Sequence, residues 1–281
     1  MLILTIIILF FLIVSFWGFY NAIRPKKIVS DITPKDLGLS YKDVNFITND
    51  GIKISGWFIP KLEDNFVNEK KAIILLHGYP ADKGNILPGM SFLSKKYNLL
   101  FFDFRYFGKS EGKYSTVGAK EVDDLLAAIS FLKNLGIEEI GVWGFSMGGA
   151  VALMTAKKAP EIKAIVSDSS YSSLHLLAPD IFRLPILRYV LAYFTGFWAK
   201  LFLKIDIKSV SPAESIKGLK IPILIIHSKK DEVIPFFHAL SIKESLKENL
   251  RAEFWFEEDL SHGQLGEEYQ RRIEEFFERN F

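Results

Sequence analysis

The chain has 281 residues, of which 49% are apolar and 24% are charged, so it can build one α/β domain with a full hydrophobic core. Its formal net charge of +2 argues against a nucleic-acid-binding protein, because such proteins usually carry a basic patch. It has no cysteine, which excludes disulfides and thiolate metal sites but does not identify a compartment.

The first twenty residues form an apolar run without a charged side chain. About twenty such residues in a helix cover the hydrocarbon core of a bilayer, so we expect a single-pass transmembrane anchor over residues 1–23. Trp17 and Tyr20 lie at its end, where interfacial aromatic side chains are common. Three basic residues follow within 24–27, and by the positive-inside rule they predict that the rest of the chain is cytoplasmic.

A cleavable signal peptide is the alternative interpretation of this segment. It would carry basic residues before the apolar run, a shorter apolar core and a cleavage site of small residues. No Lys or Arg precedes the run, and bulky side chains occupy the zone of cleavage: Phe16, Trp17, Phe19 and Tyr20. The pattern therefore favours an uncleaved anchor.

After a linker over residues 24–40, strand and helix signals alternate over residues 41–281. Strand patterns at 43–48 and 52–59 flank Asn49-Asp50-Gly51, which indicates a hairpin. The later signals, in chain order, are strands at 71–77 and 98–104, a helix at 116–135, a strand at 139–143, a helix at 148–158, strands at 163–167 and 221–227, a helix at 237–247, a strand at 252–256 and a helix at 267–278.

This order predicts an α/β fold with a mostly parallel sheet of about eight strands, covered by helices on both faces. An insert over residues 171–210 is rich in large apolar and aromatic residues. It predicts a short helical lid over an apolar pocket, while simple packing of these residues onto the core is the alternative. The insert is not a second membrane span, because basic residues interrupt it: Arg183, Arg188, Lys200 and Lys204.

The strongest chemical signal is Gly144-Phe145-Ser146-Met147-Gly148, between the strand at 139–143 and the helix at 148–158. A strand, a tight turn and a helix are the context of a G-x-S-x-G nucleophile elbow. Glycine permits the strained turn and the close approach of strand and helix, and the start of the helix favours negative charge that develops near Ser146. A glycine-rich turn with an incidental serine is the alternative, which the flanking elements disfavour.

A serine nucleophile needs a base, and after such an elbow the chain order is serine, acid, histidine. Of the five histidines, only His262 lies in the loop after the last predicted strand. The other four lie too early in the chain or on a predicted helix: His77, His175, His227 and His238. We therefore expect His262 to be the base, the alternative being an ordinary surface histidine.

The acid is expected in the loop after the strand at 221–227, where Asp231 stands. A carboxylate there can accept the imidazole N–H, fix the tautomer of His262 and stabilise the imidazolium. Asp168, which follows the strand at 163–167, is the competing candidate. For Asp231 itself, a solvated turn residue or a helix cap is the plain alternative.

An oxyanion hole needs two backbone amides that converge on one point. One is expected from Met147, the residue after the nucleophile. The other is expected from Tyr79, in the loop His77-Gly78-Tyr79-Pro80 after the strand at 71–77. His77 itself is interpreted as a buried residue that shapes this loop.

Taken together, these motifs resemble those of the α/β-hydrolase family, in family order and from about residue 44 to the C-terminus. They are His77-Gly78-Tyr79, Asp103-Phe104-Arg105-Tyr106-Phe107-Gly108-Lys109-Ser110, Gly144-Phe145-Ser146-Met147-Gly148-Gly149, the Asp231 loop with Val233 and Pro235, and Ser261-His262-Gly263. The resemblance is to the small-lid esterase and serine-aminopeptidase-like branch, which includes members with an N-terminal membrane anchor.

This resemblance implies that Asp103 and Arg105 brace the active site and are not catalytic. Two positions depart from the family pattern: many relatives have glycine at Tyr106, and glycine is common at Ser228. No metal or cofactor is expected, because the histidines are scattered singly without metal-site spacing. Gly108-Lys109-Ser110 looks like the end of a phosphate-binding loop, but that loop requires glycine where Asp103 stands.

The sequence thus predicts a serine hydrolase of the carboxylesterase or lipase-like kind, which cleaves esters of a lipophilic acyl substrate through an acyl-enzyme. A peptidase or amidase with the same triad is one alternative, because nothing in the sequence separates ester from amide. A non-catalytic, membrane-tethered binding module of the same fold is another, which the complete triad disfavours. The expected partners are a small or lipid-like acyl substrate and the membrane, with no nucleic acid.

Overall fold

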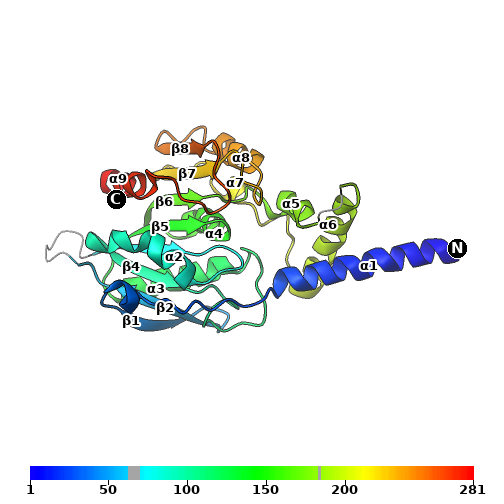
Figure 1. Ribbon diagram of the computed structural model, residues 1–281, viewed down its shortest axis with the longest axis horizontal. Helices are drawn as coiled ribbons and strands as arrows, with labels where there is room; N and C mark the ends of the chain where they lie inside the picture. The colour runs from blue at the N-terminus through cyan, green and yellow to red at the C-terminus, as the bar shows by residue number, and fades with distance from the viewer. Residues whose placement is uncertain (63–69, 183–184) are drawn as a thin grey trace.

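The computed structural model describes residues 1–62, 70–182 and 185–281, so Arg183 of the insert lies outside the described residues. It contains an eight-stranded sheet with helices on both sides (Figure 1). The strands are β1 (Lys42–Ile47), β2 (Lys53–Ile59), β3 (Lys71–Leu76), β4 (Asn98–Phe102), β5 (Glu139–Phe145), β6 (Ile162–Asp168), β7 (Ile223–Ser228) and β8 (Ala252–Glu257).

The order of the strands across the sheet is β1-β2-β4-β3-β5-β6-β7-β8. Strand β2 pairs antiparallel with β1 and β4, and all pairs from β4 to β8 are parallel. The predicted fold class, a mostly parallel sheet that opens with a hairpin, is therefore confirmed. Because β3, β5, β6, β7 and β8 run the same way, the loops that follow them meet at one edge of the sheet.

The helices are α1 (Leu2–Ile23), α2 (Lys83–Met90), α3 (Glu121–Asn134), α4 (Met147–Thr155), α5 (Leu174–Leu177), α6 (Leu187–Trp198), α7 (Pro212–Ser215), α8 (Phe237–Ser245) and α9 (Tyr269–Asn280). Shorter helical turns are η1 (Pro34–Leu37), η2 (Ser91–Lys95), η3 (Ala156–Lys158), η4 (Ala178–Ile181) and η5 (Ala199–Leu203). Helices α3, α4 and α8 pack on one face of the sheet, and α2 and α9 pack on the other.

The side chains of the central strands alternate between these two helical layers. In β3, Ala72, Ile74 and Leu76 join the core cluster with α3 and α4, whereas Ile73 and Leu75 join the cluster with α2 and α9. All five side chains are fully buried. Such apolar burial on both faces is what a parallel sheet covered by helices requires.

Helix α2 was not expected from the sequence, because Pro88 and two glycines interrupt any helical pattern in it. Its start depends instead on a reciprocal cap. The Asp82 carboxylate accepts from the backbone N–H of Asn85, while the Asn85 side-chain oxygen accepts from the backbone N–H of Asp82. Helix α3 begins at Glu121, later than the predicted start at Thr116, because the Glu121 carboxylate binds the N–H and the hydroxyl of Thr116.

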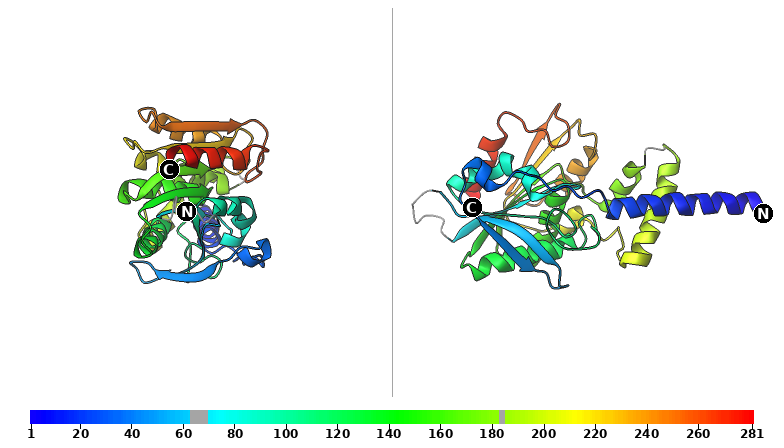
Figure 2. Two further views of the ribbon diagram at one scale, coloured as in Figure 1. Left: turned by 90° about the vertical axis from the view of Figure 1, so that its left-hand side faces the viewer. Right: turned by 60° about the horizontal axis from the view of Figure 1, so that its bottom comes forward.

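Helix α1 extends away from the body of the domain, and α6 of the insert crosses it at a steep angle (Figures 1 and 2). Helix α1 packs directly on α6 and η5: Phe19 and Ile23 form a small buried cluster with Ala199 of η5, and the Trp198 indole N–H of α6 donates to Ser15 Oγ at 3.1 Å. Among the described residues, α1 alone is long and apolar enough to cross a membrane.

Candidate active site

Ser146 stands in a sharp turn between β5 and α4. Its φ of 53° and ψ of −114° lie in a region that a residue with a side chain adopts only when its surroundings enforce it. Its backbone N–H donates to the carbonyl of Asp168 at 2.7 Å, which ties the turn to the end of the neighbouring strand β6. The serine is therefore held at the N-terminal end of a helix, at the edge of the sheet where the loops meet.

The glycines around Ser146 allow this strand and helix to approach closely. A Cβ at Gly144 would lie 2.4 Å from the carbonyl carbon of Gly148, and one at Gly148 would lie 2.5 Å from the carbonyl oxygen of Leu76. Both distances are far shorter than van der Waals contact. The motif therefore needs glycine at both positions to keep the turn.

The His262 ring lies between Ser146 and Asp231. Its Nδ1 is 2.7 Å from Oδ2 of Asp231, and its Nε2 is 3.2 Å from Oγ of Ser146. Because Nδ1–H donates to the carboxylate, Nε2 is left as the acceptor that faces the serine hydroxyl. The three side chains that the sequence analysis selected therefore lie together in the structure. They come from the loops after β5, β7 and β8.

The Asp231 carboxylate is buried but well supplied with donors. Besides His262, the backbone N–H groups of Val233 and Ile234 donate to its Oδ1 at 2.9 and 2.7 Å. Burial opposes ionisation, but the hydrogen bonds from His262 and from these amides outweigh it and hold the pKa of Asp231 below its ordinary value. The carboxylate is therefore charged at neutral pH and can stabilise a positive imidazolium.

The two loops that carry Asp231 and His262 are also tied to each other. Ser228 Oγ accepts from the backbone N–H of Leu260 at 3.1 Å, and the Glu232 carboxylate accepts from the backbone N–H of His262 at 3.3 Å. Ser228, where glycine is common in the family, therefore provides a contact that glycine would lack. The departure from the family pattern fits the local geometry.

Asp168, the competing acid, faces a different set of partners. Its carboxylate accepts from the hydroxyls of Tyr269 and Ser169, and in the described part of the chain it makes no hydrogen bond to His262. Burial raises the pKa of Asp168 to about 6 although these hydroxyls lower it. Tyr269 in turn accepts from the indole N–H of Trp143 at 3.1 Å, so Asp168 belongs to a buried structural network.

His77 shapes the loop after β3, as predicted. Its Nε2 accepts from the backbone N–H of Phe104 at 3.0 Å, and its Nδ1 lies 2.7 Å from the carbonyl of Gly78. One nitrogen therefore accepts and the other donates, which is the pattern of a neutral ring, and burial lowers the pKa of His77 accordingly.

Among the described residues, the other three histidines make no hydrogen bond to Ser146. His227 is buried and its Nε2 donates to the carbonyl of Ile234, while His238 accepts from Ser172 and burial lowers its pKa to about 4. His175 is exposed on α5. Within the described residues, only His262 hydrogen-bonds to the nucleophile.

The two backbone amides nominated for the oxyanion hole, those of Tyr79 and Met147, have no hydrogen-bond acceptor among the described residues. The loop with Tyr79 passes close to the nucleophile, since a Cβ at Gly78 would lie 3.3 Å from the Cβ of Ser146. It would also lie 2.8 Å from the Phe145 ring. Glycine therefore permits the close approach of this loop to Ser146.

The loop with Tyr79 is hydrogen-bonded to the end of α1, a contact that the sequence did not predict. The Tyr79 hydroxyl donates to the carbonyl of Ala22 at 2.8 Å. Three residues after Tyr79, the Asp82 carboxylate accepts from both the N–H and the hydroxyl of Ser30. No local pattern in the sequence predicts such contacts between distant segments.

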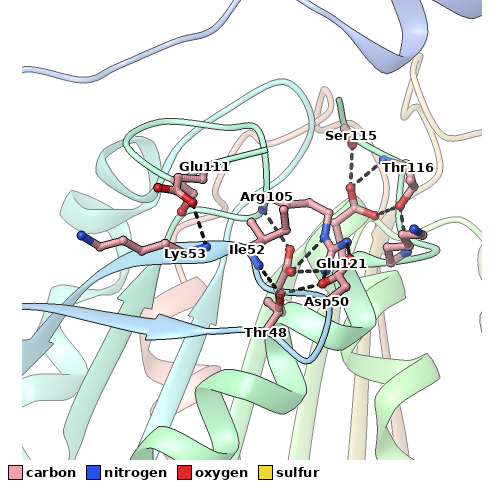
Figure 3. Close-up of polar contacts among 12 residues, drawn as sticks. Thr48, Asp50, Ile52, Lys53, Arg105, Glu111, Ser115, Thr116 and Glu121 are labelled. Carbon is pink, nitrogen blue, oxygen red and sulfur yellow. Dashed lines mark hydrogen bonds and ion pairs between the residues drawn. The ribbon is translucent and has the colours of Figure 1, made fainter. Parts of the chain in front are cut away.

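Asp103 and Arg105 brace the loops around the site, as the resemblance implied. Asp103 pairs with the Lys83 ammonium in a fully buried contact. Arg105 binds the carboxylates of Asp50 and Asp124, and Figure 3 shows its side chain pointing to Asp50 in the β1–β2 hairpin. These contacts tie the start of the loop that follows β4 to α2, to the β1–β2 hairpin and to α3.

Tyr106 departs from the glycine of many relatives for a visible reason. Its φ of 74° lies in the left-handed region that favours glycine, so its side chain adds strain to the loop. Its hydroxyl, however, donates to the carbonyl of Pro25 at 2.7 Å, just after α1. The backbone N–H of Ser115, further along the same loop, donates to the carbonyl of Ile23 at 2.8 Å. The loop after β4 therefore also secures the end of α1.

A small cavity of about 200 Å³ adjoins the site on the side of α2. Its apolar lining includes Ile86, Met90, Trp143, Phe145 and Leu265, and it reaches Gly78 and Gly263 beside the nucleophile and the histidine. The described residues contain no group of three or more His, Cys, Asp or Glu that is placed to hold a metal ion. The groups that meet at this edge are the Ser146 hydroxyl, the His262 ring and the Asp231 carboxylate.

Comparison with known proteins supports this picture at the level of fold and family. The model of the alpha/beta hydrolase fold matches residues 71–205. The protein YfhR of Escherichia coli is 31% identical over 219 residues, which cover 75% of this chain and 70% of that protein. Protein bem46 of Schizosaccharomyces pombe is 26% identical over 210 residues, covering 72% and 64% of the two chains.

Solved structures give the same result. The esterase Pf2001 of Pyrococcus furiosus superposes with a TM-score of 0.73 at 32% identity and covers 92% of this chain and 99% of that one. The acylaminoacyl peptidase of Pyrococcus horikoshii has a TM-score of 0.63 at 21% identity, covering 86% of this chain and 42% of that one. The second likeness concerns the fold alone.

Proposed function

The chain belongs to the α/β-hydrolase family, and we propose that it is a serine hydrolase that cleaves carboxylic esters of lipophilic acyl substrates. One observation carries this proposal: His262 joins Ser146 at 3.2 Å and Asp231 at 2.7 Å through its two ring nitrogens. Such a chain of contacts supplies both the base and the orienting acid that a serine nucleophile needs.

In the proposed reaction, Ser146 Oγ attacks the acyl carbonyl while His262 Nε2 takes the hydroxyl proton. The Asp231 carboxylate holds the ring and stabilises the imidazolium. The amides of Tyr79 and Met147 bind the oxyanion of the tetrahedral intermediate. His262 then gives the proton to the leaving alcohol, and a water molecule, activated by the same histidine, releases the acid and restores Ser146.

Two observations support an apolar ester substrate. The esterase of Pyrococcus furiosus is 32% identical, and the match covers 92% of this chain and 99% of the esterase. The peptidase neighbour shares the fold only. The cavity beside Ser146 is lined mainly by apolar side chains, among them Met90 and Phe145, so it suits a short hydrocarbon group.

A panel of acyl esters with graded chain length, with aminoacyl amides beside them, tests this substrate class. We expect ester hydrolysis to exceed amide hydrolysis, and we expect kcat/KM to be highest for the short acyl chains that the cavity of about 200 Å³ can hold. The Ser146→Ala variant is the matched control and should lose turnover on every member of the panel. Faster cleavage of the amides would instead establish a peptidase or amidase with the same triad.

We also propose that α1 is an uncleaved single-pass anchor and that the catalytic domain is cytoplasmic. The span Thr5–Ile23 has a mean hydropathy of 2.2, and basic residues follow it directly. Cleavage as a signal peptide would remove Phe19 and Ile23 from the cluster with α6 and would remove the Ala22 carbonyl that Tyr79 binds.

Extraction of cell membranes with alkaline carbonate tests the anchor. The full-length protein should stay in the pellet, and intact mass spectrometry should find the N-terminal segment still attached. Protein that carbonate releases in full-length form would refute the anchor, and a mature chain that lacks the segment would establish a signal peptide. Neither outcome would affect the assignment of Ser146.

A further inference from the structure

Helix α1 has two halves with different surroundings. From Leu2 to Phe10 the described side chains are exposed to solvent. After Phe10 one helical stripe becomes partly or fully buried, and it includes Leu12, Ser15 and Phe19. The C-terminal half of α1 is thus part of the domain, and only the N-terminal half projects freely (Figures 1 and 2).

The free half of α1 is too short to cross a bilayer alone. At the rise of an α-helix, the stretch from Leu2 to Phe10 is about 14 Å long. This is roughly half the thickness of the hydrocarbon core. If α1 spans the membrane, the part of it that packs against α6 must therefore enter the membrane too.

Helix α6 exposes large aromatic side chains on its outer face. Its inner face, with Leu191, Ala192 and Thr195, is buried. Its outer face nevertheless carries large side chains, with Tyr193 75%, Tyr189 59% and Phe197 49% exposed. A helix that is apolar on all sides is normally covered by protein or by lipid.

The ends and edges of this face match a membrane interface. Leu201 and Phe202 of η5 extend the apolar surface, and Lys200, Lys204 and Lys208 stand exposed around them. Lysines beside apolar and aromatic side chains suit the boundary between acyl chains and anionic headgroups. Tyrosines occupy the same boundary, because one end of the ring is apolar and the other is polar.

An apolar groove of about 540 Å³ lies where α1 and α6 meet. It is lined by Leu12, Ile13, Phe16, Trp17, Tyr20 and Trp198. The steep crossing of the two helices means that α6 lies roughly in the plane of a membrane that α1 enters (Figure 1). The groove then opens to the acyl chains.

We propose that the outer face of α6, together with η5, is a membrane-docking surface whose occupant is a lipid bilayer. The protein then rests on the membrane through two elements, α1 inserted and α6 lying in the interface. The carboxyl edge of the sheet faces the same side, since Tyr79 of the oxyanion loop touches Ala22 at the end of α1. Resting on the proposed function, this arrangement presents Ser146 to acyl substrates that arrive from the lipid phase.

Because the chain has no cysteine, single cysteines can report the position of each surface. Tyr193→Cys and Phe197→Cys place a probe on α6, and Ile6→Cys places one on the free half of α1. Leu250→Cys is the matched control, because Leu250 is 98% exposed but precedes β8 at the opposite edge of the sheet. Each full-length variant is labelled with an environment-sensitive fluorophore and reconstituted into phosphatidylcholine–phosphatidylglycerol vesicles, with and without a spin-labelled lipid.

We expect the probes on α6 and α1 to shift to the blue and to lose most of their emission to the spin-labelled lipid, while the Leu250 probe does neither. Quenching at Ile6 alone would overturn the docking of α6 and leave the anchor in place. Quenching at none of the sites would overturn both. A blue shift at Tyr193 that depends on protein concentration without vesicles would assign the face to a second copy of the chain. Fluorophosphonate labelling of the same samples reports separately on Ser146, so a failure of docking is distinct from a failure of the proposed function.

Discussion

Strands β6 and β7 lie side by side and run in the same direction; β6 ends at the buried Asp168, and the loop after β7 carries the buried Asp231. Asp168 is 5% exposed and Asp231 is 6% exposed, so burial does not distinguish them. Their partners do. The Asp231 carboxylate binds the His262 ring and two backbone amides, whereas the Asp168 carboxylate, among the described residues, binds the hydroxyls of Tyr269 and Ser169.

Burial raises the pKa of both carboxylates, but their net pKa shifts have opposite directions. Burial raises the pKa of Asp168 to about 6, and the two hydroxyls do not compensate for it. At Asp231, His262 and the amides outweigh burial and lower the pKa. A buried aspartate at this edge of the sheet can therefore orient a histidine only if the surrounding loops also supply hydrogen-bond donors to the carboxylate and place a histidine ring beside it.

Of the substitutions in these two networks, we expect that of Asp231 to lower activity most. In Asp231→Asn the amide can hold His262 in the wrong tautomer, so we expect kcat/KM for a short ester to fall by about 10⁴-fold with the fold intact. Steady-state kinetics with a circular dichroism control measures this. If Asp168→Asn lost more activity than Asp231→Asn, the assignment of the acid would be wrong.

Asp168→Asn should act on stability and should leave most of kcat/KM in place. The folded protein keeps the Asp168 proton up to about pH 6, whereas the unfolded chain releases it near the ordinary value of 3.8. The folded state therefore binds more protons in this interval, so the contribution of this group to stability is lost as the pH rises from about 4 to about 6. The Asn variant lacks that loss.

Thermal unfolding at a series of pH values measures this difference. The Tm of Asp168→Asn should gain on the wild type as the pH rises through that interval, and the difference should stay constant above it. Parallel curves for the two proteins would mean that the Asp168 carboxyl titrates alike in the folded and unfolded chains.

The smallest expected effect is at Tyr269. In Tyr269→Phe, Asp168 loses a donor and the Trp143 indole loses its acceptor, so we expect a loss of about 1–3 kcal/mol of stability. Since the Tyr269 hydroxyl lowers the pKa of Asp168 in the folded protein, its loss should extend the upper end of the pH interval over which Asp168 affects stability. A change in kcat/KM as large as that of Asp231→Asn would show that the two networks are not separate.

The sequence predicted the sheet correctly, and it selected three candidate triad residues that lie together in the structure, because both follow from local patterns and chain order. Apolar runs mark the strands, Gly144 and Gly148 mark the elbow, and loop position selects Asp231 and His262. These signals need no knowledge of contacts between distant segments.

What the sequence did not predict depends on distant partners. Helix α2 depends on the cap between Asp82 and Asn85. The position of the Tyr79 loop depends on a hydrogen bond from the Tyr79 hydroxyl to the carbonyl of Ala22. The sequence around a tyrosine does not indicate which distant carbonyl its hydroxyl will bind. Asp168 competed with Asp231 in the sequence because Tyr269, its partner, lies far along the chain.

Covalent labelling of Ser146 tests the central claim most directly. The wild-type protein is incubated with a fluorophosphonate, digested and analysed by mass spectrometry, with Ser146→Ala and His262→Ala in parallel. The account predicts one adduct on the peptide that contains Ser146, no adduct in Ser146→Ala and much slower labelling in His262→Ala, because the serine then lacks its base. Equal labelling of Ser146→Ala, or an adduct on another residue of the wild type, would contradict it.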